Sequence, residues 1–145
     1  MRTTITTALI TASLLMLPTA ASAHSNHCQD TRLGEQMESL KQHFKTYRQA
    51  LSETDWQQMR LARTEMQQLA RDASQEQPLK LHDLPTEQHP LLMQEYTEGL
   101  EQLGQLFAQL KQAEQSQDED AVAELVGRIG QHSKQSHESL RKDCH

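Results

Sequence analysis

Residues 33–51, LGEQMESLKQHFKTYRQAL, decide the fold class of this chain. Their large side chains recur at alternating intervals of four and three residues, at Leu33, Met37, Leu40, Phe44, Tyr47 and Leu51. That spacing places all six on one side of an α-helix and is typical of a helix packed in a bundle. The stretch therefore predicts a first helix from about Asp30 to Leu51.

Three further segments repeat the helical spacing. Their apolar residues are, in the second, Met59, Ala62, Met66, Leu69 and Ala73; in the third, Met93, Tyr96, Leu100, Leu103, Phe107 and Leu110; and in the fourth, Val122, Leu125, Val126 and Ile129. The link between the first two helices is only a few residues long, so they should be antiparallel neighbours. We predict an all-α fold, an antiparallel up-down-up-down four-helix bundle.

Local signals mark the helix ends. Thr54-x-x-Gln57 has the form of a capping box for the second helix, and Asp118 or Asp120 can cap the fourth. The only long connection precedes the third helix, and Pro90 suits the first turn of that helix.

The chain is acidic, with a formal net charge of −6 at pH 7. A negative protein is a poor partner for nucleic acid or for an anionic membrane, so neither is expected. Only 5 glycines and 4 prolines occur in 145 residues, which favours long regular helices over a loop-rich fold.

Residues 1–23 have the features of a secretory signal peptide. Arg2 gives a positive start, an apolar run extends from Ala8 to Leu17, and Ala21-Ser22-Ala23 is a cleavage signal. We expect cleavage after Ala23, export, and no membrane anchor in the mature chain. Residues 24–145 would then form one domain, which is large enough to bury one core.

The fourth helix changes character in its last turns, within IGQHSKQSHESLRKDC at residues 129–144. Beyond Ile129 its inward stripe meets Ser133, Ser136 and His137 instead of large aliphatic residues. Small side chains beside one imidazole leave room for a large group. We hypothesise that this group is a haem and that His137 binds its iron.

Met37 is the candidate for the opposite ligand. It lies nine residues after Cys28, and His137 lies seven residues before Cys144, which is roughly 13 and 10 Å along antiparallel helices. A thioether and an imidazole at matched depth form a Met/His axial pair for haem iron. A methionine that fills the core and a hydrogen-bonded core histidine are the alternatives.

Four motifs, spread over nearly the whole mature chain, resemble those of the cytochrome b562 family. They are Leu33-x-x-x-Met37-x-x-Leu40, Pro78-Leu79-Lys80-Leu81, Tyr96-x-x-Gly99-Leu100 and His137-x-x-x-Arg141. The resemblance implies a periplasmic electron carrier, not an enzyme, with one non-covalent haem b. It also implies a methionine ligand on the first helix and a histidine ligand on the last, at Met37 and His137.

Residues 133–141 also look like the C-x-x-C-H-x-x-[FY]-R attachment site of cytochromes c′, which share the fold. Ser133 and Ser136 stand at the cysteine positions, so thioether bonds cannot form and a b-type site is favoured. A b-type relative is expected to carry a basic residue at Ser133, near the haem edge, whereas Arg141 is available for a propionate. The expected pocket wall, with ordinary core as the alternative, is Leu40, Phe44, Tyr96, Leu100 and Leu103.

The remaining histidines and both cysteines leave alternatives open. His43, His82, His89 and His132 are expected at the surface. The bundle should bring together both chain ends, with His24, His27, Cys28, Cys144 and His145. These residues could form a Cys28–Cys144 disulfide or, with free thiols, a copper or zinc site.

Two other functions therefore stay possible from the sequence: a metal-binding helical protein and a haem-free interaction protein. An oxidative enzyme is not expected, because two axial ligands leave the iron no open site. We expect a monomer that meets an unidentified periplasmic redox partner.

Overall fold

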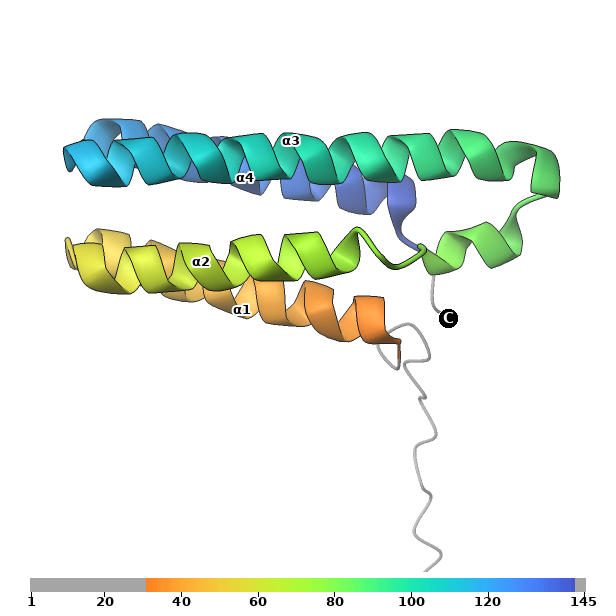
Figure 1. Cartoon of the computed structure of the whole chain (residues 1–145), viewed down its shortest axis with the longest axis horizontal. Coiled ribbons are helices and arrows are strands. Elements are labelled where there is room, and N and C mark those ends of the chain that lie inside the picture. The colour runs from red at the N-terminus through yellow and green to blue at the C-terminus, as the bar shows by residue number, and fades with distance from the viewer. Residues whose placement is uncertain (1–30, 143–145) are drawn as a thin grey trace, which may run out of the picture.

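The computed structural model describes residues 31–142, which form four long α-helices. These are α1 (Arg32–Ser52), α2 (Trp56–Ala73), α3 (His89–Ser116) and α4 (Glu119–Leu140). The helices run antiparallel in two layers, with α1 beside α2 and α3 beside α4 (Figure 1). The predicted all-α four-helix bundle is confirmed.

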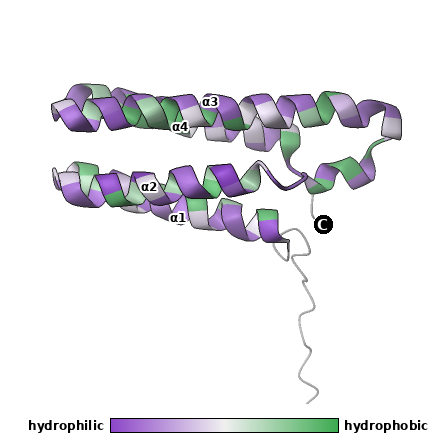
Figure 2. Ribbon diagram, in the orientation of Figure 1, coloured by the Kyte–Doolittle hydropathy of each residue, from purple (hydrophilic) through white to green (hydrophobic). Residues whose placement is uncertain are grey.

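The core lies between the two layers, and each helix contributes one side to it. Polar and apolar residues alternate along every helix (Figure 2), as expected when only one side of each helix is buried. The largest fully buried side chains include Tyr47, Met59, Met66, Phe107, Leu110, Val122 and Ile129. Most residues of the predicted stripes are therefore core residues.

The buried side of α1 is rotated from the predicted one. Its buried residues are Gln36, Leu40, Tyr47 and Ala50, whereas Met37 and Phe44 are half-buried. The cause is packing between helices. Because α1 contacts α2 far more than any other helix, the residues of α1 that face α2 are the ones buried.

The short α1–α2 link changes the predicted cap of α2. Thr54 adopts a left-handed backbone conformation, with φ of 53°, which reverses the chain within three residues. Asp55 then caps α2, because its side chain accepts a hydrogen bond of 3.0 Å from the Gln58 amide. The predicted capping box at Thr54 is thus wrong, whereas Asp118 caps α4 as expected.

The connection from α2 to α3 crosses one end of the bundle (Figure 1). It contains two short 3-10 helices, η1 (Leu79–Asp83) and η2 (Thr86–Gln88). Pro78 and Leu81 are buried and anchor the connection against the helices. Pro90 lies in the first turn of α3, as predicted.

The opposite end of the bundle is closed by a buried polar network. Glu114, only 2 % exposed, accepts a hydrogen bond of 3.0 Å from the Tyr47 hydroxyl and one of 2.9 Å from Arg63 Nε. Arg63 also donates to Gln67 at 2.7 Å. The network joins α1, α2 and α3, and burial, followed by the charge of Glu114, raises the pKa of Tyr47.

Candidate functional site

Met37 lies at the level of the last turn of α2. An ion pair between Arg32 Nε and Glu76 Oε1, 3.2 Å apart, shows that the start of α1 lies beside the chain just after α2. About one turn further along α1, Met37 is therefore opposite the turn that ends at Ala73. The Tyr96 hydroxyl donates to the Ala73 carbonyl at 2.5 Å, which brings α3 to the same level.

The end of α4 reaches this level as well. Gly99 lies less than one turn from Tyr96, and a Cβ built on Gly99 would lie 3.6 Å from Ser136 Oγ. His137 follows Ser136 directly. Met37 and His137 therefore lie at the same depth of the bundle, on α1 and α4.

His137 lies on the flank of α4 that faces away from α3. His132 Nε2 is 2.8 Å from the Gly99 carbonyl, so His132 marks the flank toward α3. Five residues correspond to about 140° around a helix, which puts His137 on the other flank, on the side of α1. His137 is exposed rather than inward, because it lies about 80° from the line of the buried Ile129.

Met37 has the mirrored position on α1. Arg32 marks the flank of α1 toward α2, and Met37 lies five residues later, again about 140° around the helix. Its side chain is half-buried. The two residues thus occupy the flanks of α1 and α4 that are turned toward each other, and within residues 31–142 neither side chain makes a hydrogen bond.

The apolar core ends before it reaches this level on α4. The fully buried residues of α4 are Val122, Leu125 and Ile129. Ser133 and Ser136, which continue the stripe, are half-buried, and no side chain from residue 130 to residue 142 is fully buried. The change from aliphatic to small residues along α4 therefore coincides with the end of its fully buried side.

Gln36, beside Met37, has a buried polar atom that is not hydrogen-bonded within residues 31–142. Its side chain is 8 % exposed, and its Oε1 has no hydrogen-bond partner within the described part of the chain. A buried acceptor without a donor costs about 1–3 kcal/mol, so such atoms are rare in folded proteins. Sequence reasoning missed this residue, because a glutamine next to a methionine gives no signal of burial.

The expected pocket wall is present in part. Leu40, Tyr96 and Leu103 are buried, whereas Phe44 and Leu100 are half-buried. Burial, followed by the charge of Glu76, raises the pKa of Tyr96 to about 12, so its hydroxyl stays a neutral donor. Tyr96 thereby ties α3 to α2 beside the site.

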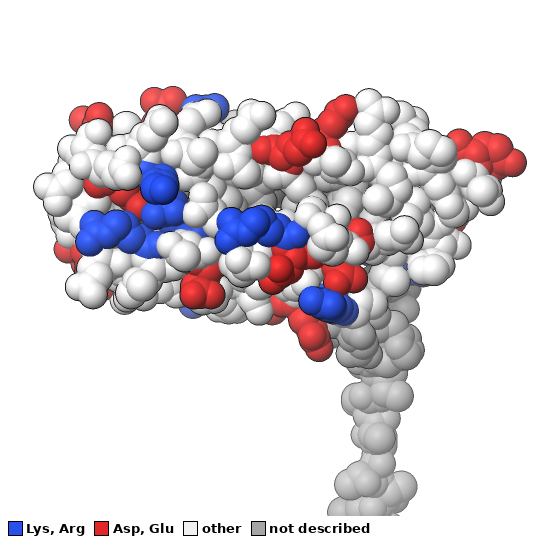
Figure 3. Space-filling view, viewed as in Figure 1, with Lys and Arg blue, Asp and Glu red and all other residues white. Residues whose placement is uncertain are grey.

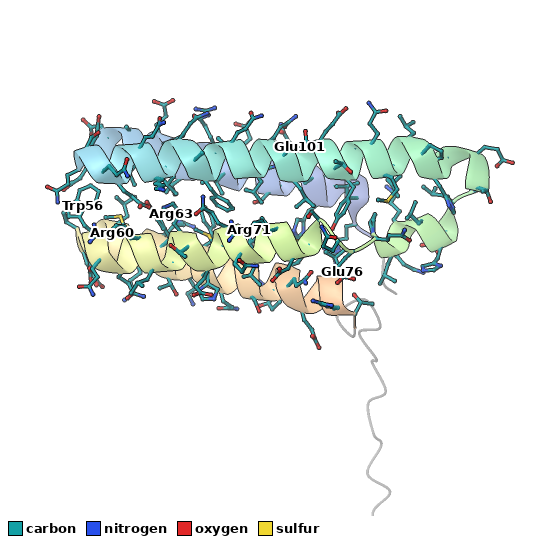
Figure 4. All side chains as sticks on the ribbon, viewed as in Figure 1. Trp56, Arg60, Arg63, Arg71, Glu76 and Glu101 are labelled. Atoms are coloured by element: carbon teal, nitrogen blue, oxygen red, sulfur yellow. The ribbon has the colours of Figure 1, made fainter. Side chains whose placement is uncertain are left out.

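A groove of about 390 Å³ lies between α2 and α3 and has Tyr96 and Leu100 in its lining. Arg71 and Glu101 lie on its two sides (Figure 4). On the same face, basic side chains gather over α2, and acidic side chains lie over both layers (Figure 3). Neither Met37 nor His137 borders this groove, so it lies behind the pocket wall rather than between the two candidate ligands.

Two other predicted contacts lie at the end of α4. Ser133 is half-buried and Arg141 is exposed. The Arg141 amide donates to the His137 carbonyl at 3.2 Å and closes the last turn of the helix. The guanidinium therefore stands one turn from His137, at the surface, where a propionate could reach it.

Three of the four histidines expected at the surface are partly buried. His132 contacts Gly99 as described, His89 Nε2 lies 3.0 Å from the Leu84 carbonyl, and His43 is half-buried; only His82 is exposed. Residues 31–142 contain no group of three His, Cys, Asp or Glu placed to hold a metal ion. The terminal cluster and the predicted Cys28–Cys144 disulfide lie outside the described residues.

This arrangement suits a planar iron porphyrin. A thioether and an imidazole are the donors that bind haem iron in Met/His sites, and here they stand at one level on facing flanks. Small residues of α4 lie on the same turns as His137, and Tyr96, Leu40 and Leu100 supply apolar side chains beside the site. The chemistry of the donor set therefore fits a haem.

Comparison with known protein families also points to a haem protein. Curated proteins give no match to this chain. The family model of cytochrome b562 matches residues 32–141, which includes all four helices. No described helix is long and apolar enough to cross a membrane. Cytochromes b562 are haem-binding, electron-transfer helical bundles with a b-type haem, and this chain belongs to the cytochrome b562 family.

Proposed function

We propose that this protein is a periplasmic electron carrier that binds one haem b without covalent bonds, between Met37 and His137. The observation that supports this most directly is their common level on the facing flanks of α1 and α4. When bound, the haem would supply a one-electron iron couple. The protein is then a carrier rather than an enzyme, because both axial positions would be filled.

Each residue of the site has a separate task in this proposal. The His137 imidazole and the Met37 thioether hold the iron, and the thioether favours the ferrous state. Ser133 and Ser136 keep the space open and form no thioether bond. Arg141 pairs with a propionate at the surface, which orients the group without burying a charge.

The test is reconstitution of the purified protein with haemin. We expect a low-spin spectrum that sharpens on reduction, and complete extraction of the haem by acid–acetone. His137→Ala should nearly abolish binding, and Met37→Ala should give a weaker, more high-spin site with a lower reduction potential. His82→Ala is the matched control and should bind like the wild type, because His82 is exposed and makes no hydrogen bond within residues 31–142.

The result that would overturn the proposal is a wild-type protein without a haem-induced spectrum. That result would leave the haem-free interaction protein. Stoichiometric copper or zinc that is lost on chelation would instead support the metal-binding alternative. Location is tested separately: cell fractionation should place the protein in the periplasm, with His24 as its first residue by mass.

A further inference from the structure

The α2–α3 connection contacts both helices that carry the candidate ligands. Glu76, at its start, pairs with Arg32 at the first turn of α1. Lys80, in η1, donates from Nζ to the Ser139 carbonyl in the last turn of α4. Asp83, at the end of η1, accepts a hydrogen bond of 2.9 Å from Lys142.

The two outer contacts of this strap, Arg32–Glu76 and Asp83–Lys142, are surface ion pairs, and Lys80–Ser139 lies between them. Lys80–Ser139 and Asp83–Lys142 are both separated by 59 residues in the sequence, so η1 follows the end of α4 in constant register. Pro78 and Leu81 are buried and fix η1 to the bundle. The contact at Ser139 is partly buried, where a charge-assisted hydrogen bond is stronger than in water.

Within residues 31–142, the side chains at the end of α4 are at most half-buried. Beyond Ile129 none of its side chains, as far as residue 142, is fully buried. α1 packs mainly on α2, and α4 mainly on α3, so the spacing between α1 and α4 is not set by their own contact. The orphan carbonyls of the last turn of α4 need donors, and Lys80 supplies one from outside the helix.

We propose that the α2–α3 connection is a clamp that sets the separation of α1 and α4 at Met37 and His137, with Lys80 as its central positioning residue. This inference rests on the proposed haem site. Lys80 does not touch the ligands. It holds the helical turn of His137, and Glu76 holds the start of the helix that carries Met37. A site preorganised in this way loses its ligand more slowly.

Lys80→Met tests the clamp, because methionine keeps most of the aliphatic stem and removes the donor. In the haem-free protein, amide hydrogen exchange of residues 139–142 should accelerate about tenfold, because the substitution removes one charge-assisted hydrogen bond. Amides around Phe107, in the core, should not change and serve as the internal reference. Lys134→Met, an exposed lysine of α4 that lies 4.0 Å from Glu138, is the matched control and should leave exchange unchanged.

In the haem-loaded protein, Lys80→Met should speed haem transfer to excess apomyoglobin about tenfold and raise the high-spin fraction of the ferric spectrum. Lys80→Arg keeps a donor of similar reach and should restore both values to within about twofold of the wild type. A purely structural role would not shift the spin state of the bound haem.

Unchanged amide exchange in Lys80→Met would overturn the clamp itself. Faster exchange with unchanged haem transfer and spin state would overturn the positioning role. A wild-type protein that takes up no haem would overturn the proposed function and the positioning role together. The exchange measurement would then still decide whether the connection holds the end of α4.

Discussion

The two ends of the bundle differ in how completely their buried polar groups are hydrogen-bonded. At the end where α1 turns into α2, Tyr47, Arg63 and Glu114 are buried and all their polar contacts are made. At the end with Met37 and His137, α4 has no fully buried side chain between residues 130 and 142, and the buried Gln36 Oε1 has no hydrogen-bond partner within residues 31–142.

In the proposed function, one end of the bundle serves stability and the other serves haem binding. The closed end packs three helices around an ionic network whose hydrogen bonds are made. The other end has serines on α4, and a Gln36 oxygen with no partner within residues 31–142, where a sequence optimised for stability would place leucine. Local violations of folding rules are expected at functional sites, and the serines of α4 and the unpaired Gln36 oxygen both lie at the end with Met37 and His137.

Glu114→Ala should break the closed end. Arg63 would be left as a buried charge without its partner, which costs about 3–5 kcal/mol of unfolding free energy. Urea denaturation of the haem-free protein measures this loss. Glu101→Ala, at an exposed position of the same helix, should stay within about 0.5 kcal/mol of the wild type. A loss below about 1 kcal/mol for Glu114→Ala would remove the distinction between the two ends.

Two alanine substitutions on α4 should show where its fully buried side ends. Ile129→Ala deletes a fully buried side chain and should cost about 2–5 kcal/mol. Ser136→Ala, two turns further on, removes a half-buried hydroxyl and should cost less than about 1 kcal/mol. Both follow from urea midpoints of the haem-free protein, and equal losses would mean that the core extends past Ile129.

Alkaline pH should weaken both ends through their tyrosines. The pKa of Tyr96 is raised from 10.0 to about 12, so the unfolded chain releases this proton first as pH rises. Unfolding free energy should therefore fall between pH 10 and 12, by at most about 1.4 kcal/mol per pH unit for this residue. Tyr47, whose pKa is also raised, adds a fall of the same sign.

The contribution of each tyrosine can be separated from that of the lysines by comparing variants. The difference in stability between wild type and Tyr96→Phe, measured by urea unfolding at pH 8 and at pH 11, should shrink at the higher pH. Tyr47→Phe should behave alike at the closed end. A constant difference across this range would show that the hydroxyl titrates normally in the folded protein.

Gln36→Leu should give the smallest effect and the opposite sign. Removing an unsatisfied buried acceptor should raise the stability of the haem-free protein by roughly 1 kcal/mol. Gln57→Leu, at an exposed site of α2, is the control and should give no gain. Thermal or urea unfolding measures both, and a loss of stability in Gln36→Leu would show that its amide is held after all.

Local sequence signals determined most of the architecture. The four-and-three spacing of apolar residues, the Asp118 cap and Pro90 act within one or two helical turns, so they are readable without a structure. The small residues after Ile129 also marked the level of the candidate site. Matched distances from the chain ends brought Met37 and His137 to one depth for the same reason: the rise per residue of a helix is constant.

Only the tertiary structure decided which side each helix turns to its neighbours. Gln36 is buried instead of Met37 because α1 packs mainly against α2. His132 rather than His137 faces α3, because α4 approaches α3 closely at Gly99. The network of Tyr47, Arg63 and Glu114, and the strap of Lys80 onto Ser139, join residues more than fifty positions apart. Such pairs depend on helix rotation and register, which arise from packing between helices and leave no periodic trace within any one of them.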